Sequence, residues 1–301
     1  MIASAAAPSL SRVRPLDVPR ALGSTGLEVG AIGLGSSYGV GGSDIERAFE
    51  RGVNFFMWGS RRRSGFGEGL AALARNHREN TVIALQSYTR VGWLMKPFVH
   101  SALRKLGTDY VDVLGLAWWN DLPSRRVLDA AVALRESGKV RHLMISCHHR
   151  PSFERFLGEP AYESWMLRYN AAHPGAEREV FPLIAEDETK RPGVLAFTAT
   201  RWGSLLDPRL TPPGEATPRA SDCYRFALSN SKVDVCLAGP KNSAELDEAI
   251  AAMERGPMSE DELAWMRRVG KSIRESDSSG RAMSWIDKLA TSCRPQLPAR
   301  S

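Results

Sequence analysis

The stretch NFFMWGSRRRSGFGEGL, from Asn54 to Leu70, has the pattern of one strand, one loop and the start of one helix. Its first part is apolar and rich in strand-forming side chains, its middle is small and cationic, and its last part has helical spacing. Such steps build α/β enzyme barrels, whose reactive side chains stand at the ends of the strands. At that point this chain places Met57 and then Trp58, which do not titrate. The stretch therefore predicts an enzyme's architecture and leaves its chemistry open.

The same step recurs along the chain. Short apolar runs alternate with amphipathic segments after an opening hairpin, ALGSTGLEVGAIGLG, whose continuation gives the first strand. The later strands are expected in VNFFMW, TVIALQ, YVDVLGL, VRHLMIS, WMLRYN, GVLAFTA and VDVCLA, and one of the helices in AEREVFPLIAE. This order predicts a (β/α)8 TIM barrel with an N-terminal β-hairpin and an extra C-terminal helix in SEDELAWMRRVGKSIRES. A doubly wound sheet is disfavoured because GLGSSYG lacks the G-x-G-x-x-G spacing.

The pattern also divides the chain of 301 residues into three parts. We expect a disordered leader over residues 1–19, one barrel domain over 20–276, and a loosely attached polar tail over 277–301. No apolar run approaches the roughly 20 residues of a membrane span. A membrane protein is therefore not expected.

Composition excludes several classes of function. The four cysteines lie far apart without a CxxC pair, which argues against a zinc site and a disulfide framework and favours a reducing, cytoplasmic location. The formal charge of +6 is spread along the chain, without a zinc finger or a dense basic arm, so nucleic acid is not an expected partner. His148, His149 and His173 lack metal-ligand spacing, and no metal site is expected. The sequence leaves the oligomeric state open.

Several segments resemble the aldo-keto reductase superfamily, from about Arg20 to Glu275. They share its order along the chain: LGSTGLEVGAIGLGS, GVNFF, LGTDYVDVLGL, SGKVRHLMIS and VDVCLAGPKNSAELDEAI. The resemblance implies a barrel that binds a nicotinamide cofactor, NADP(H) or NAD(H), across its mouth and delivers hydride to a carbonyl. It also implies a tyrosine as the proton donor, assisted by a lysine, an aspartate and a histidine.

The residues at the four catalytic positions depart from the family's pattern. Met57 stands where the family has aspartate, Arg62 where it has tyrosine, Gln86 where it has lysine and Ala117 where it has histidine. Arginine is not a usable proton donor because its pKa stays above roughly 12. We therefore expect the family's ordinary mechanism to be absent.

Some of the family's cofactor-binding features survive. The resemblance implies that Ser146 holds the nicotinamide amide and that Phe197 stacks beneath the nicotinamide ring. It places the adenosine phosphates at the turn into the last barrel helix and the adenine near an acidic residue; these positions are Gly239, Pro240, Lys241, Asn242 and Glu248. The same turn is also explained as a simple helix cap.

Replacement catalytic groups are expected on the loops after the strands. His148 and His149 titrate near neutral pH, and the hydroxyl of Tyr88 could reach the same cavity; the alternative is that the histidines are ordinary loop residues. Cys147 beside them suggests a nucleophile less strongly, because adjacent side chains rarely point together.

Aromatic and cationic residues predict a pocket at the same loops. Trp58, Trp118, Trp119 and Trp202 suit a flat apolar ligand or a cation, although two of these rings could simply be core packing. Arg61, Arg62, Arg63 and Arg201 could clamp an anion or form a solvated surface. The expected partner is a small molecule, anionic or aromatic.

Three functions remain open at this point. The first is a nicotinamide-binding oxidoreductase that reduces carbonyls weakly or by another proton donor. The second is a noncatalytic pseudoenzyme that senses a ligand or cofactor. The third is a lyase or isomerase that uses the histidine and arginine loops without a nucleotide.

Overall fold

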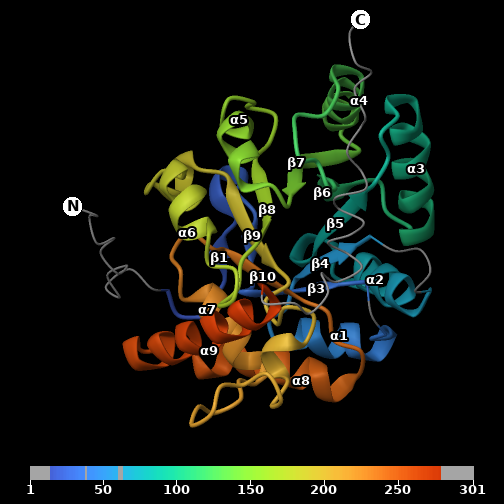
Figure 1. The fold of residues 1–301 in the computed structure, drawn as a ribbon. Helices are drawn as coiled ribbons and strands as arrows, with labels where there is room; N and C mark the ends of the chain where they lie inside the picture. The colour runs from blue at the N-terminus through green and yellow to red at the C-terminus, as the bar shows by residue number, and fades with distance from the viewer. Residues whose placement is uncertain (1–13, 38, 60–63, 279–301) are drawn as a thin grey trace, which may run out of the picture.

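The computed structural model describes residues 14–37, 39–59 and 64–278. Within these ranges the chain forms a closed barrel of eight parallel strands surrounded by helices (Figure 1). The strand order is β10-β3-β4-β5-β6-β7-β8-β9, so each strand pairs with its successor and β10 closes the barrel against β3. The predicted (β/α)8 architecture is confirmed.

The strands are β1 (Arg20–Ala21), β2 (Glu28–Val29), β3 (Ile32–Gly35), β4 (Phe55–Trp58), β5 (Val82–Ser87), β6 (Val111–Leu116), β7 (Val140–Cys147), β8 (Ser164–Arg168), β9 (Gly193–Phe197) and β10 (Val235–Ala238). The α-helices are α1 (Gly42–Glu50), α2 (Ser64–Asn76), α3 (Met95–Leu106), α4 (Arg125–Glu136), α5 (Phe153–Leu157), α6 (Ala176–Glu179), α7 (Ala220–Leu228), α8 (Ser243–Arg255) and α9 (Glu260–Ser278). Short 3-10 helices are η2 (Gly23–Thr25), η3 (Arg78–Asn80), η4 (Gly92–Leu94), η5 (Arg150–Ser152), η6 (Phe181–Leu183), η7 (Glu188–Lys190) and η8 (Ser204–Leu206).

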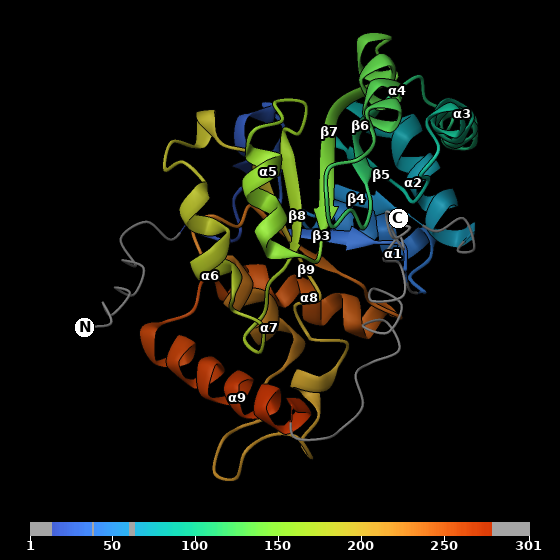
Figure 2. The same ribbon diagram turned by 45° about the horizontal axis from the view of Figure 1, so that its top comes forward.

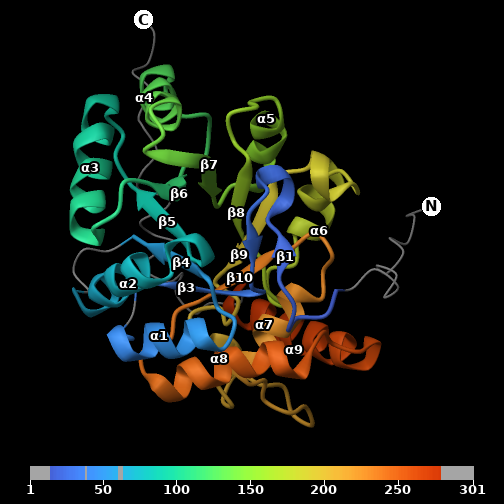
Figure 3. The same ribbon diagram turned by 180° about the vertical axis from the view of Figure 1, so that it is seen from behind.

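The hairpin of β1 and β2 closes the amino-terminal end of the barrel. Seen from behind, it lies in front of the strands (Figure 3). Its side chains Leu22, Leu27 and Val29 join the apolar cluster inside the barrel. Gly23 has a φ of 51°, and a Cβ there would lie 2.3 Å from the backbone nitrogen of Gly193. A larger residue would therefore push the hairpin away from β9.

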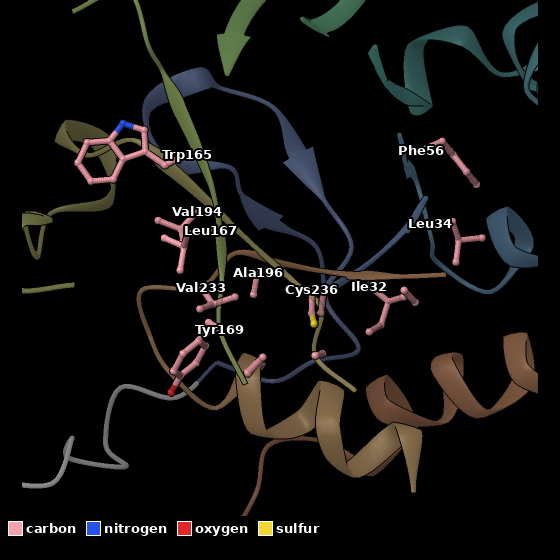
Figure 4. Packing of buried hydrophobic residues seen from close by; sticks show 14 of the residues in the cluster. Ile32, Leu34, Phe56, Trp165, Leu167, Tyr169, Val194, Ala196, Val233 and Cys236 are labelled. Atoms are coloured by element: carbon pink, nitrogen blue, oxygen red, sulfur yellow. The ribbon is translucent and has the colours of Figure 1, made fainter. Parts of the chain in front are cut away.

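Side chains point alternately to the two sides of each strand and so form two apolar layers, one inside the barrel and one between the strands and the helices. Phe55 and Leu195 belong to the cluster inside the barrel, whereas their neighbours Phe56 and Ala196 face the surrounding helices. Figure 4 shows part of the outer layer, where Trp165 of β8 is among the largest fully buried side chains. The strand ends therefore present alternate side chains to the barrel mouth.

Two expectations from the sequence need correction. The expected helix in AEREVFPLIAE ends at Glu179, and the 3-10 turn η6 follows, because Pro182 has no N–H to donate and its ring blocks a helix. The barrel unit also begins before residue 20. Leu16 is 1% exposed, and Arg14 donates a hydrogen bond of 2.8 Å to Asp234.

The extra helix α9 is present and packs outside the barrel beside α7 (Figure 2). Two bidentate ion pairs hold it, Arg267 with Glu177 and Arg225 with Glu262. None of the described helices is both long enough and apolar enough to cross a membrane.

Candidate active site at the barrel mouth

The carboxyl ends of the strands place four singled-out residues on the inner face of the barrel. Met57 belongs to the interior cluster, and Gln86, Ser146 and Phe197 each lie two residues beyond an interior side chain of their own strand. Because side chains alternate along a strand, these residues face the inside of the barrel, as their interior neighbours do. They form the base of the mouth.

The positions assigned to the family's catalytic residues hold no titratable group where the structure describes them. Met57 is 4% exposed, Gln86 8% and Ala117 0%. The Tyr88 hydroxyl donates a hydrogen bond of 3.1 Å to Oε1 of Gln86. Arg62 lies outside the described residues, as do Arg61 and Arg63.

Four ring side chains from different strand ends meet at the mouth. Tyr88 packs edge-on against Trp118 at 5.4 Å, Trp118 against His148 at 6.0 Å, and His148 against Phe197 at 5.1 Å between ring centroids. The interplanar angles of 73° to 80° are the edge-to-face geometry that aromatic rings prefer. We call these four residues the aromatic array. It combines the predicted catalytic candidates Tyr88 and His148 with the predicted stacking residue Phe197.

The loops around the array carry unusual backbone geometry. Among the described residues, the non-glycine positions with positive φ are Trp118 (57°), Thr198 (61°), Arg201 (52°) and Trp202 (53°). All four lie just after β6 or β9, on the rim of the mouth. Such left-handed residues cost free energy and collect at functional sites, because only a well-determined surrounding maintains them.

Arg90 fixes the loop that carries Trp118. Its Nη2 donates a hydrogen bond of 2.7 Å to the carbonyl of Trp118, and its guanidinium lies 4.0 Å from the ring centroid of Trp119. The backbone N–H of Trp119 donates to the carbonyl of Ser146 at 2.9 Å. No sequence motif indicates this role, because Arg90 lies two residues after Tyr88 in a loop without a recognisable pattern.

Ser146 contains an unsatisfied polar group. The residue is 0% exposed, and its hydroxyl has no hydrogen-bond partner among the described residues. A buried hydroxyl without a partner costs roughly 1–3 kcal/mol, so it is a candidate for a contact with a ligand.

The neighbouring Cys147 and His149 take other roles. Cys147 packs in the outer apolar layer, and burial raises the pKa of its thiol to about 12 although the His149 N–H donates to the sulfur. A thiol in that state is not an activated nucleophile. His149 is exposed, and its Nδ1 lies 2.9 Å from Oγ of Ser152, outside the aromatic array.

The four tryptophans that were predicted to line a pocket also have different roles in the structure. Trp58 is 7% exposed and belongs to the outer layer, where its ring lies against Gly67 of α2, and Trp119 packs on the same layer. These two rings are core packing. Trp118 is 42% exposed and Trp202 36%, so both are accessible on the rim.

A cluster of arginines lies near the ends of β8 and β9. Burial, together with Arg168 and Arg201, lowers the pKa of His173 to about 3. Arg201 is 8% exposed and donates to the carbonyl of Ile273 at 3.4 Å. This side of the mouth therefore has a positive potential, which the sequence suggested for Arg201 and not for Arg168.

The turn into α8 is held by contacts within the protein. Asn242 accepts a hydrogen bond from the Glu245 N–H, and the Lys241 N–H donates to the Glu245 carboxylate, both at 2.9 Å. Glu248 accepts from the hydroxyl of Ser221 at 2.6 Å. Gly239 and Pro240 precede this cap in the loop after β10. These contacts explain the segment as a helix cap, while Lys241 itself is exposed.

Metal chemistry finds no support in the described ranges. No group of three or more His, Cys, Asp or Glu side chains in them could hold a metal ion.

Comparison with known proteins gives a consistent picture. No family model matches the chain. It is 25% identical to L-galactose dehydrogenase of Arabidopsis thaliana, over 78% of this chain and 87% of that protein. It is 28% identical to norsolorinic acid reductase B of Aspergillus parasiticus, over 61% of this chain and 57% of that protein.

Solved structures match over nearly their whole length. The aldo-keto reductase AKR11C1 from Bacillus halodurans, in its holo form, superposes with a TM-score of 0.71 at 19% identity, covering 84% of this chain and 96% of that one. The chain has the fold of the aldo-keto reductases. The aldo/keto reductase from Klebsiella pneumoniae, in complex with NADP and acetate, superposes with a TM-score of 0.66 at 19% identity, covering 83% of this chain and 94% of that one.

Proposed function

We propose that this protein is an aldo-keto reductase relative, which binds a nicotinamide nucleotide across the barrel mouth and acts as an oxidoreductase without the family's usual proton donor. The observation that carries the proposal is the buried Ser146 hydroxyl without a described partner, on the inner face of β7. A carboxamide has both a donor and an acceptor, so a nicotinamide amide fits this group. Phe197, on the inner face of β9, offers a ring for stacking beside it.

The relatives support the same class of reaction. Their names describe a dehydrogenase and a reductase, and the Klebsiella pneumoniae structure holds NADP. When bound, a reduced nicotinamide supplies hydride to a carbonyl carbon, and the oxygen must then receive a proton. In the aromatic array, Tyr88 and His148 carry a proton that can be transferred. We propose these two residues as the donor candidates, because His149 bonds to Ser152 instead.

The substrate we propose is a small carbonyl compound with a flat or apolar body and an anionic group. The exposed rings of Trp118 and Trp202 suit the apolar part, and Arg201 with its neighbouring arginines suits the anion. NADP(H) and NAD(H) are both candidates for the cofactor.

A titration with NADPH and NADH, followed by calorimetry and tryptophan fluorescence, tests nucleotide binding. Ser146→Ala should weaken binding by about 3- to 10-fold, the value of one hydrogen bond. Ser164→Ala is the matched control, since Ser164 is also buried with an unpartnered hydroxyl but lies at the opposite end of the barrel. If wild-type protein binds neither nucleotide, the proposal fails.

Turnover is tested separately with a panel of carbonyl compounds. Tyr88→Phe or His148→Gln should lower kcat while the nucleotide Kd stays unchanged, which identifies the donor. Nucleotide binding without any turnover would instead favour the second candidate function, a noncatalytic cofactor-sensing barrel. The apolar or neutral residues Met57, Gln86 and Ala117 favour that alternative.

A further inference from the structure

A cavity lies outside the barrel mouth, between η4 with the start of α3 and the long face of α4. Its volume is about 1090 Å³. In Figures 1 and 2, α3 and α4 lie side by side at the edge of the molecule. The residues that line this groove are Arg90, Val91, Gly92, Trp93, Lys96, Ser124, Arg125, Arg126, Ala130, Ala133, Leu134 and Ser137.

The walls of the groove are held in place by the backbone. A Cβ on Gly92 would lie 2.3 Å from the carbonyl oxygen of Arg126, so the two segments are in direct contact. Only glycine permits this approach. The groove is therefore a formed feature of the fold.

Charge is concentrated at one end of the groove. Arg90, Lys96, Arg125 and Arg126 line it, and no carboxylate does. Arg125 is paired with Asp129 at 2.9 Å, whereas Lys96 and Arg126 form no ion pair with any residue that the structure describes. These cations lie around the start of α4 and the start of α3. An anion here would meet several positive charges.

The other end of the groove is apolar. Ala130, Ala133 and Leu134 follow Arg126 on one face of α4, because they are spaced by three or four residues. From Arg126 to Ser137 the helix rises by about 16 Å, at 1.5 Å per residue. Trp93, on the wall formed by η4, is 76% exposed, so most of this large apolar ring is open to solvent.

We propose that this groove binds an elongated amphiphile with an anionic head group, such as a medium-chain carboxylate. The cations receive the head group, and the small apolar side chains of α4 with the ring of Trp93 receive the chain. A length of about 16 Å matches an extended chain of roughly a dozen carbons, and burying each methylene contributes about 0.8 kcal/mol. The groove lies outside the mouth, and its proposed ligand does not require a nucleotide to be bound there.

Calorimetric titration with dodecanoate, kept below its micelle concentration, tests the proposal. The expected result is saturable binding, with the double substitution Lys96→Glu and Arg126→Glu weakening it at least 10-fold. Ala133→Phe, which fills the groove and keeps the charge, should weaken binding to a similar extent. The matched control is Arg104→Glu with Lys105→Glu, two exposed cations at the far end of α3, and it should bind as the wild type does.

Two further probes test whether binding requires an anionic head group and whether the ligand comes from a lipid surface. Dodecyltrimethylammonium has the same chain with a cationic head and should bind much more weakly. Cosedimentation with phosphatidylglycerol vesicles that is lost in the Lys96→Glu, Arg126→Glu protein would support the same chemistry with a lipid surface as its source. Equal binding of both amphiphiles, or equal loss in the Arg104→Glu, Lys105→Glu control, would overturn the proposal.

Discussion

At the scale of single residues, the buried ion pair at the amino-terminal end of the barrel should be costly to break. Arg191 and Asp234 are 1% and 0% exposed and form a bidentate pair with distances of 2.9 and 2.6 Å. Asp234→Asn leaves the guanidinium buried without its counterion, so we expect a loss of about 3–5 kcal/mol in the free energy of unfolding. Urea denaturation measures this loss. The exposed pair of Asp187 and Lys190 supplies the control. Asp187→Asn should change stability little, because the amide oxygen can still accept from the Thr189 N–H.

His173 makes a prediction about pH. Burial and the nearby Arg168 and Arg201 lower its pKa to about 3, below the value of about 6.5 in the unfolded chain. Between these values the unfolded state binds a proton that the folded state does not. Stability should therefore fall as the pH drops from about 6.5 toward 3, by at most about 1.4 kcal/mol per pH unit.

The variant His173→Gln tests this linkage. Urea denaturation between pH 7 and 4.5 should give a shallower loss of stability for the variant than for the wild type, because glutamine does not titrate. Equal slopes for the two proteins would contradict the assigned cause.

The sequence predicted part of the candidate site, and the limit has a physical reason. Alternation along a strand is local, so it placed Ser146 and Phe197 toward the mouth and can explain why Cys147 faces outward. The edge-to-face contacts of His148 and the left-handed Trp118 depend on tertiary packing. No local pattern could have shown that Arg90 holds this loop.

At the scale of elements, a mutation can test how closely the extra helix α9 packs against the barrel. A Cβ on Gly270 would lie 2.3 Å from the backbone carbonyl of Ala171. Gly270→Ala should favour an isolated helix by about 1 kcal/mol, yet in this protein the clash should destabilise by about 1–3 kcal/mol. Thermal unfolding distinguishes the two signs. Lys271→Ala, on the same helix at an exposed position, should have little effect.

The bounds of the helices also show which secondary-structure predictions from sequence patterns are accurate. The long amphipathic segment SEDELAWMRRVGKSIRES predicted α9 close to its observed bounds, since its spacing repeats over several turns. The helix predicted after β8 is shorter than expected because Pro182 interrupts it. The predicted start of the barrel domain is too late because the packing of Leu16 depends on distant parts of the chain.

At the scale of the whole molecule, nucleotide binding should stabilise the barrel. A ligand that binds only the folded state at 100 times its Kd adds about 2.7 kcal/mol to the free energy of unfolding. The Tm should therefore rise with NADPH or NADH, and rise less in Ser146→Ala at the same concentration. An unchanged Tm at every nucleotide concentration would count against the proposed function.

Arg90 lies on the boundary between two spaces, since it lines the groove beside α4 and also donates to the carbonyl of Trp118 at the mouth. A head group that attracts this guanidinium competes with that carbonyl. Thermodynamic linkage then requires reciprocity: if dodecanoate changes the nucleotide Kd by some factor, nucleotide must change the dodecanoate Kd by the same factor. Arg90→Lys should reduce this heterotropic effect. The lysine ammonium lacks the planar guanidinium, which can donate hydrogen bonds to the head group and to the Trp118 carbonyl in a fixed geometry. The groove would then act as an effector site for the barrel.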